Sequence, residues 1–298
     1  MNITITGNTG FVGQNLSKYL SSKNLNVSGL SLRNSWNFPK GASAIIHLAG
    51  KAHDTSNTSA EEEYFKVNRD LSIQLFEEFL KSEAKDFFYF SSVKAAADIV
   101  DGILDESCSA NPQTPYGKSK LEAEKHLLDQ KLQGDKRLFI IRPCMIHGPG
   151  NKGNLNLLYK IVEKGMPWPL ASFTNERSFL SIDNLNFLIL KILENKNVPS
   201  GIYNFADDKT ISTNQLVQII AIASGKNEKL WKINSKLISS VAKIGDILKL
   251  PLNSERLKKL TESYVVSNAK IKAALRLEKL PVSAIEGLTK TILSFKKP

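Results

Sequence analysis

The amino-acid sequence predicts an α/β fold, in which a doubly wound parallel sheet is followed by a smaller, mainly helical C-terminal region. Three observations support this prediction. Over the first 150 residues, short apolar runs alternate with longer stretches of helical periodicity. A glycine-rich turn follows the first apolar run. Beyond residue 208 the patterns are almost entirely helical. A chain of 298 residues with 42% hydrophobic content is expected to form two domains at most.

The predicted elements follow one another in the order expected for strand–helix–strand units. Each predicted strand is a short apolar run, and each predicted helix repeats apolar residues at three-and-four spacing. Strands are expected at 3–6, 27–32, 44–48, 87–91, 138–142 and 201–205. Helices are expected at 11–22, 62–82, 118–132, 155–164, after residue 183, at 231–250 and at 282–295.

Basic residues outnumber acidic ones, and the excess is concentrated near the C-terminus. Lys and Arg total 40 against 29 Asp and Glu, and residues 226–298 contain sixteen of the former and six of the latter. This balance suits a nucleic acid, an anionic membrane surface, a phosphate-bearing small molecule, or simply solvated helix faces. No nucleic-acid-binding motif accompanies the charge, so we expect no nucleic-acid partner.

Composition also argues against several other classes of protein. No apolar run reaches the ~18–20 residues of a membrane span, and Met1 leads directly into a strand-like run rather than a signal peptide. We therefore expect a soluble, cytoplasmic protein without stable membrane insertion. Cys108 and Cys144 are expected to be reduced thiols. The histidines lack metal-ligand spacing, so no metal site is predicted.

The glycine-rich turn lies between the first predicted strand and the first predicted helix. Gly7, Gly10 and Gly13 have the spacing G-x-x-G-x-x-G, and Phe11 and Val12 open the helix. A dinucleotide pyrophosphate needs close backbone approach, free N–H donors and the positive end of a helix dipole. These five residues therefore predict the phosphate site of a Rossmann-type domain, the alternative being a tight turn without a ligand.

The end of the second predicted strand bears on the choice of dinucleotide. NAD-selective folds usually place an acidic residue there, whereas an arginine suits the 2′-phosphate of NADP. Arg33 stands at this position, and the next acidic residue after Gly13 is Asp54, well beyond the end of this strand. NADP(H) is therefore favoured as the cofactor, and NAD(H) is the alternative. Arg33 could also be a solvent-exposed loop residue with no role in cofactor binding.

A serine, a tyrosine and a lysine follow at spacings that suit hydride-transfer chemistry. Ser92 follows the fourth predicted strand, and Tyr116 and Lys120 are four residues apart on one helix face introduced by Pro115. A lysine ammonium beside a phenol, together with a cationic nicotinamide, is expected to stabilise the phenolate and make the tyrosine a reversible proton carrier. Ser92 can hydrogen-bond the same substrate oxygen.

With these motifs, the chain resembles the extended short-chain dehydrogenases/reductases of the NAD(P)-dependent nucleotide-sugar epimerase/dehydratase family over nearly its whole length. The resemblance is carried by the glycine turn, His47–Gly50, Val67-Asn68, Tyr89–Ser92, Tyr116 with Lys120, Arg142-Pro143, His147–Gly150 and residues 177–183. It implies a cofactor domain of residues 1–153 plus about 178–206, and a substrate domain of about 154–177 and 207–298. It also implies a homodimer formed through the helix at 62–82 and the helix that starts near Tyr116.

The resemblance further implies roles for individual residues. Ser92, Tyr116 and Lys120 correspond to the family's catalytic triad, which also contacts the cofactor or the substrate. The other residues implied along the cofactor are Leu48, Ala49, Gly50, Asn68 and Pro143. For a nucleotide-sugar substrate, Arg177 is implied at the pyrophosphate. Lys94 is expected at the sugar pocket, and Arg256 as a second diphosphate contact or as an ordinary surface arginine.

Departures from the family pattern narrow the expected reaction. Val93 and Lys94 stand where sugar dehydratases of the family have an Asp-Glu pair, so elimination of water has no obvious acid and base. Met145 replaces an asparagine frequent in 4-epimerases. The missing acid after the second strand suits a reductase that exchanges NADPH for NADP. Bacterial UDP-4-keto-6-deoxy-HexNAc 4-reductases of surface-polysaccharide pathways are resembled by residues 91–94, by Arg142-Pro143 with residues 148–150, and by residues 252–261. A UDP-hexose or HexNAc 4-epimerase with retained NAD, and a non-catalytic dinucleotide-binding sensor or assembly protein, are the alternatives.

The segment 231–250 has a second interpretation besides a helix that caps the substrate domain. Its apolar residues recur at helical spacing, with lysines among them. This pattern is also typical of an interfacial membrane helix. The capping helix, with its lysines in water, is the favoured reading.

Overall fold

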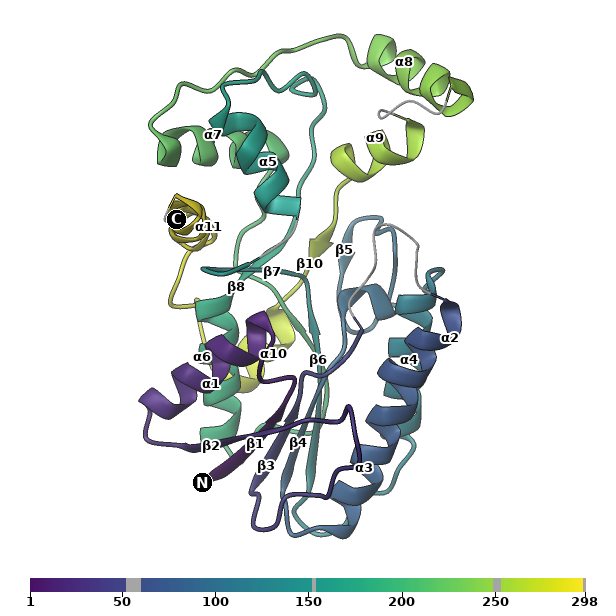
Figure 1. Ribbon diagram of the computed structural model, residues 1–298, viewed down its shortest axis with the longest axis vertical. Coiled ribbons are helices and arrows are strands. Elements are labelled where there is room, and N and C mark those ends of the chain that lie inside the picture. Colours follow the sequence, from purple (N-terminus) through teal and green to yellow (C-terminus); the bar gives the residue numbers. More distant parts are fainter. Residues whose placement is uncertain (52–59, 152–153, 249–252, 297–298) are drawn as a thin grey trace.

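The computed structural model describes residues 1–51, 60–151, 154–248 and 253–296. Its centre is a six-stranded parallel sheet with the order β2-β1-β3-β4-β6-β9, seen nearly edge-on in the lower half of Figure 1. The strands are β1 Asn2–Thr6, β2 Asn26–Leu30, β3 Ala44–His47, β4 Asp86–Phe90, β6 Arg137–Pro143 and β9 Gly201–Phe205. They agree with the predicted strands to within two residues at each end.

The strand order reverses direction at β1, which positions the site. From β1 the chain continues to β2 on one side, and β3 then returns to pair with the other side of β1. A ligand crevice forms at the carboxyl ends of two neighbouring parallel strands when the connections that leave them lead to opposite sides of the sheet. Here those ends are followed by the glycine turn after β1 and by Leu48–Gly50 after β3.

Alternating side chains of the buried strands build two hydrophobic layers, one on each face of the sheet. On one face, Ile46 and Phe88 pack with α1 (Phe11–Ser22) and α6 (Ile182–Glu194). On the other face, Ile45 and Phe87 pack with α3 (Leu71–Lys81) and α4 (Pro115–Leu128). Figure 1 shows these helix pairs on opposite sides of the sheet.

The helix predicted as one element over 62–82 is divided in the structure. It consists of α2 (Glu61–Tyr64), a π-helical segment η1 (Phe65–Asp70) and α3. A π segment inserts an extra residue into the helical repeat, and such segments frequently occur at functional sites. The helical pattern at 118–132 corresponds to α4, which begins at Pro115, as the placement of Tyr116 and Lys120 on one helix predicted. Thr114 caps this helix by accepting the backbone N–H of Gly117.

The remaining elements form a second, mainly helical group. The helices are α5 Asn154–Glu163, α7 Thr213–Ser224, α8 Ser235–Leu248, α9 Ser254–Thr261, α10 Ala269–Leu275 and α11 Ala284–Phe295. Outside this group, a single 3₁₀ turn, η2 (Val93–Ala95), follows β4. Two small parallel pairs join β5 (Ile103–Leu104) to β10 (Val265–Val266) and β7 (Met145–His147) to β8 (Phe179–Ser181). Residues of α5, α7, α8, α9 and α11 share one hydrophobic cluster, whereas Ile271 of α10 belongs to the cluster of the sheet.

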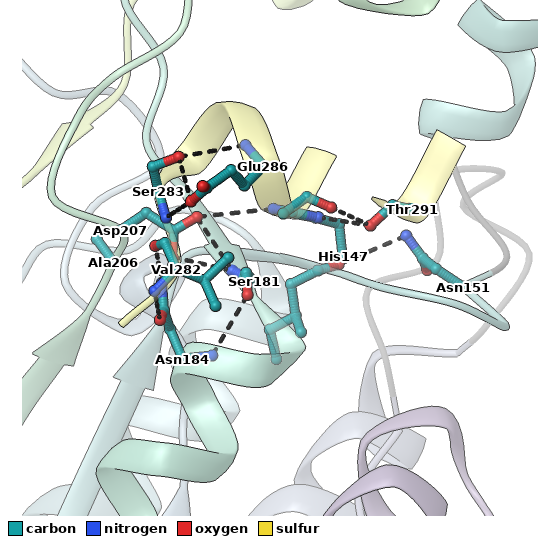
Figure 2. A network of polar contacts seen from close by, with 12 residues as sticks. His147, Asn151, Ser181, Asn184, Ala206, Asp207, Val282, Ser283, Glu286 and Thr291 are labelled. Atoms are coloured by element: carbon teal, nitrogen blue, oxygen red, sulfur yellow. Dashed lines mark hydrogen bonds and ion pairs between the residues drawn. The ribbon is translucent and has the colours of Figure 1, made fainter. Parts of the chain in front are cut away.

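A buried polar network attaches α11 to the sheet domain (Figure 2). Asp207, which follows β9, accepts the backbone N–H of Ser181 and the side-chain amide of Asn184 at 2.7 Å. His147 contacts Thr291 of α11, with 2.9 Å between Nδ1 and Oγ1. Since these groups are buried, each lost contact would leave a polar atom without a partner, and the network fixes how the helical group sits on the sheet.

Candidate active site

The glycine turn is shaped for close approach of a ligand to the backbone. Gly7 has φ of +67°, and a Cβ there would lie 2.8 Å from the backbone nitrogen of Ala49. Gly10 caps α1 without a side-chain hydrogen bond, and the first turn of α1 contains no acidic residue. The first turn of α1 therefore brings no carboxylate of its own to the N–H groups and the positive end of the helix, which fits a dinucleotide pyrophosphate.

Phe11, Val12 and Gly13 connect this turn to the rest of the fold. A Cβ at Gly13 would collide with the backbone of Asn8, so only glycine lets α1 start this close to the turn. Val12 packs against the hydrophobic cluster of the sheet. The ring of Phe11 lies beside Gly148, 3.3 Å from where a Cβ would stand. The turn is thus bordered by the loop that follows β7.

The segment Leu48–Gly50 is held by a chain of hydrogen bonds that the sequence analysis did not identify. Thr6 Oγ1 accepts the backbone N–H of Ala49 and lies 2.7 Å from His47 Nδ1. The other ring nitrogen lies 2.8 Å from Ser72 Oγ. Burial, with a smaller contribution from the charge of Lys120, lowers the pKa of His47 to about 3. A neutral His47 therefore connects β1, β3 and α3; the only signal in the sequence was a histidine ending a strand.

Asn68, implied along the cofactor by the resemblance, is buried in the π-helical segment and bonds to protein groups. Its Oδ1 accepts the backbone N–H of Lys51 at 2.8 Å, and its Nδ2 donates to the Lys51 carbonyl at 3.1 Å. The same Nδ2 donates to Ser119 Oγ of α4 at 3.2 Å. A Cβ at Gly50 would lie 2.9 Å from Asn68 Oδ1. Asn68 therefore joins the segment after β3 to the helix that bears Tyr116 and Lys120.

Ser92 and Tyr116 meet where β4 ends and α4 begins. Ser92 caps η2 by accepting the backbone N–H of Lys94 at 3.2 Å. Burial raises the pKa of Tyr116, and a hydrogen bond with the Ser92 side chain opposes the increase. Without a cofactor, removal of the phenol from water has the largest effect on this pKa; the lowering expected from Lys120 together with a cationic nicotinamide stays a prediction.

Lys120 lies one helical turn beyond Tyr116, with its ammonium inside the site. Its Nζ donates to the Phe90 carbonyl at 2.8 Å and lies 4.9 Å from the centre of the Tyr89 ring. A Cβ at Gly50 would be 3.2 Å from this nitrogen, so the lysine faces the segment after β3. Burial lowers the pKa of Lys120 to about 8 in spite of the opposing effect of Glu124. Lys120 is thus mainly an ammonium at neutral pH.

Glu124 is the centre of a buried charged cluster that the sequence analysis did not assign. Its carboxylate accepts hydrogen bonds from Ser91 Oγ and from the guanidinium of Arg142, whose Nε lies 2.9 Å from Oε1. The Glu124 and Arg142 side chains are 1% and 3% exposed. The i, i+4 spacing from Lys120 could have indicated Glu124, but its pairing with β6 is a tertiary contact.

Lys94 and Arg177, both predicted for the substrate, lie close enough for their charges to interact, and the Lys94 ammonium donates to the Asp98 carbonyl at 2.8 Å. Burial lowers the pKa of Lys94; Asp98 and Glu262 oppose this, and Arg177 adds to the decrease. Arg177 donates from Nη1 to the Lys259 carbonyl of α9 at 3.1 Å, and burial lowers its pKa as well. Two cations that lose hydration in this way would gain from an anionic group such as a diphosphate.

The last three predicted residues occupy different surroundings. Pro143 is the buried last residue of β6. Arg33 is exposed, three residues beyond β2. Arg256 is exposed on the first turn of α9, where its backbone N–H is capped by Asn253 at 2.8 Å.

Known proteins that resemble this chain include several enzymes. The chain is similar to UDP-glucose 4-epimerase of Vibrio cholerae, with 31% identity over 75% of this chain and 76% of that protein. It is also similar to N-acetyl-alpha-D-glucosaminyl-diphospho-ditrans,octacis-undecaprenol 4-epimerase of Escherichia coli O157:H7, with 28% identity over 72% and 70% of the two chains. GDP-6-deoxy-D-mannose reductase of Pseudomonas aeruginosa is 23% identical over 73% and 78%.

Solved structures with the same fold span nearly the whole chain. RMD from Pseudomonas aeruginosa complexed with NADPH has a TM-score of 0.73 at 18% identity, covering 98% of both chains. UDP-glucuronic acid 4-epimerase from Bacillus cereus in complex with NAD has a TM-score of 0.76 at 18% identity, covering 99% of both. The model of the NAD dependent epimerase/dehydratase family matches residues 3–206. The chain therefore belongs to the NAD dependent epimerase/dehydratase family of extended short-chain dehydrogenases/reductases.

Proposed function

We propose that the protein is an NADP(H)-dependent reductase that acts on C4 of a UDP-4-keto-6-deoxy-hexosamine in surface-polysaccharide biosynthesis. The observation that carries this proposal is the convergence of Ser92, Tyr116 and Lys120 beside Gly50 and the glycine turn. In this proposal, residues 1–153 with about 178–206 bind the cofactor. Residues about 154–177 and 207–298 bind the nucleotide sugar, and the active form is a cytoplasmic homodimer.

In the proposed reaction, the protein's own groups manage the proton and the charge. When bound, the nicotinamide would supply a hydride for C4 of the sugar. Tyr116, whose pKa is raised by burial, remains protonated at neutral pH and donates its phenolic proton to the C4 oxygen. Ser92 donates a hydrogen bond to the same oxygen, and the ammonium of Lys120 stabilises the phenolate that remains. The ketone thus becomes an alcohol by gaining one hydride and one proton.

Two features support a reductase rather than a dehydratase. Val93 and Lys94 follow Ser92 directly, so this position lacks the carboxylate pair that elimination of water would use. Lys94 follows Ser92 by two residues and, with Arg177, supplies positive charge that suits the diphosphate of the substrate. Arg256 is proposed as a second diphosphate contact.

The preference for NADP(H) rests on Arg33 and is open to a direct test. Among proteins of this fold, RMD from Pseudomonas aeruginosa was solved with NADPH and the Bacillus cereus epimerase with NAD, so the fold accommodates both. Arg33 is exposed beyond the end of β2. A guanidinium at this position favours a 2′-phosphate.

A 4-epimerase with retained NAD is the second candidate, and the similarity to the Vibrio cholerae enzyme favours it. The same three residues would serve both directions of hydride transfer, with the 4-keto sugar turning over between them. Met145, which is exposed after β6, replaces the asparagine frequent in such epimerases.

One experiment separates the candidates. Purified protein is incubated with NADPH or NADH and a UDP-4-keto-6-deoxy-HexNAc, and the near-ultraviolet absorbance of the reduced nicotinamide is followed. Stoichiometric oxidation of the cofactor, with formation of the 4-hydroxy sugar, supports the reductase. Interconversion of UDP-GlcNAc and UDP-GalNAc without added cofactor supports the epimerase. Cofactor binding without either reaction would favour a sensor or assembly protein and reject both enzymatic proposals.

A further inference from the structure

Helix α8 exposes a continuous apolar stripe to solvent. Leu237, Val241, Ile244 and Leu248 follow the 4-3-4 spacing that aligns side chains along one helix face. In this order, these four residues are 59%, 45%, 51% and 63% exposed to solvent. Ile247, at the edge of the stripe, is 80% exposed. Single exposed apolar residues are common on protein surfaces, but five on one face of a 14-residue helix require an explanation.

This stripe is not the face by which α8 packs on the protein. Ile238, Ala242 and Gly245 are buried on a neighbouring face, and Ile238 and Ala242 join the cluster that includes Leu257 of α9. A helix that only capped the substrate domain would need this packed face alone. Within the residues that the structure describes, α8 therefore has a second apolar face without a partner.

The charges beside the stripe indicate the chemistry of the partner. Lys236 and Lys243 are seven residues apart and run along the edge of the stripe next to Ile247. Asp246, the acidic residue of α8, points to the opposite side and accepts hydrogen bonds from Ser254. Trp231, four residues before α8 begins, is 55% exposed. Apolar side chains bordered by lysines and an exposed tryptophan suit an anionic bilayer surface.

We propose that the exposed stripe of α8 docks on an anionic phospholipid surface, lying in the plane of the headgroups with Lys236 and Lys243 at its edge. Among the described residues, none of the helices is both long and apolar enough to cross a bilayer, so the proposed attachment is peripheral. The apolar side chains enter the acyl boundary while the lysine stems extend their charges to the phosphates.

A second copy of the chain fits the stripe less well. Five partly exposed side chains of this size offer on the order of 500 Å², below the ~800 Å² that each partner buries in a standard interface. Antiparallel pairing of two α8 helices would also set the Lys236–Lys243 edge of one copy against the same edge of the other. Anionic headgroups neutralise this edge, whereas a second copy repeats its charge.

Docking through α8 would turn the substrate side of the protein toward the membrane. Helix α8 packs on α9, and the Lys259 carbonyl of α9 accepts a hydrogen bond from the guanidinium of Arg177. Figure 1 shows α8 and α9 at the end of the molecule remote from the N-terminus. The bilayer would therefore contact the element next to the proposed diphosphate site rather than the sheet domain.

Vesicle co-sedimentation of the full chain tests the proposal without relying on activity. We expect binding to vesicles of equal parts phosphatidylglycerol and phosphatidylcholine, and little binding to vesicles of phosphatidylcholine alone. Raising the salt concentration should weaken the binding because exposed charges are screened. The Lys236→Gln/Lys243→Gln variant should reduce the partition coefficient about 25-fold, from about five-fold for each lysine.

The apolar contribution is tested with two matched variants. Ile247→Glu should reduce vesicle binding at least about ten-fold, because it places a charge where a side chain enters the acyl boundary. Ile222→Glu makes the same change at a residue of α7 that is 73% exposed, against 80% for Ile247. Figure 1 shows α7 and α8 on opposite sides of the upper half of the molecule. Ile222→Glu should bind as the wild type does, and both variants should retain the wild-type circular dichroism spectrum.

Three results would overturn the proposal. One is a wild-type protein that does not sediment with the anionic vesicles. Another is equal loss of binding in Ile247→Glu and Ile222→Glu, since the stripe would then have no special role. The third is light scattering in which Ile247→Glu dissociates an oligomer while vesicle binding stays at the wild-type level, which would assign the stripe to a second copy of the chain.

Discussion

Replacing Tyr116 with phenylalanine should abolish most turnover while leaving the fold and cofactor binding intact. The change removes the phenolic oxygen and its hydrogen bond with Ser92. The ring itself packs edge-on against Tyr64, with 6.2 Å between the ring centres. The packing of the ring is retained, so the stability cost is about 1 kcal/mol. Loss of a positioned general acid lowers kcat by about 10²–10⁴, which corresponds to about 3–5 kcal/mol in the activation barrier.

The assay is single-turnover oxidation of bound NADPH by the 4-keto sugar, with cofactor affinity measured separately by titration calorimetry. The cofactor Kd should change less than about three-fold, because the proposed pyrophosphate contacts come from the glycine turn. Tyr159→Phe is a matched control, since this tyrosine of α5 hydrogen-bonds Glu163 at 2.9 Å and lies in the helical cluster. A Tyr116→Phe enzyme that retained more than about a tenth of wild-type kcat would refute the proposed proton donor.

Three further predictions concern charge. Turnover should fall as pH rises through about 8, because the buried Lys120, with a pKa of about 8, is then no longer an ammonium; Lys120→Met should be slow and lose this limb of the pH profile. Arg142→Met should lower the free energy of unfolding in urea by about 3–5 kcal/mol, since it leaves the buried Glu124 carboxylate without its cation. Adding Glu124→Gln should restore part of that loss. Arg33→Ser should raise the Kd of NADPH about 10- to 100-fold and leave that of NADH unchanged.

Each of these predictions has a contradicting outcome. A pH profile that stays flat between about 7 and 9 would exclude the titration of Lys120 from the reaction. Arg142→Met should differ clearly from Lys81→Met, which breaks an exposed ion pair with Glu78 and should leave the unfolding midpoint unchanged; equal midpoints would contradict the argument from burial. If Arg33→Ser weakened the binding of NADPH and NADH equally, Arg33 would not act through the 2′-phosphate.

The elements that the sequence predicted well have local causes. The helix at 11–22 was predicted with the bounds that α1 has, because the glycine turn begins it and its apolar spacing is regular. The central strands β3 and β4 were predicted because parallel strands buried on both faces are runs of apolar residues. By contrast, the π-helical segment inside the predicted helix at 62–82 depends on Asn68, which bonds to Lys51 and Ser119. Those partners are remote in sequence, so local periodicity could not reveal the extra residue.

The sequence by itself determined the α/β sheet, the glycine turn and the spacing of Tyr116 and Lys120 on one helix face, because these follow from backbone geometry and short-range patterns. Tertiary structure decided the ionisation of the site, since the raised pKa of Tyr116 and the lowered pKa of Lys120 both come from burial by other segments. It also decided which apolar residues of α8 are covered and which remain exposed. Burial depends on chain segments that meet only in the folded protein, and a single sequence does not specify their contacts locally.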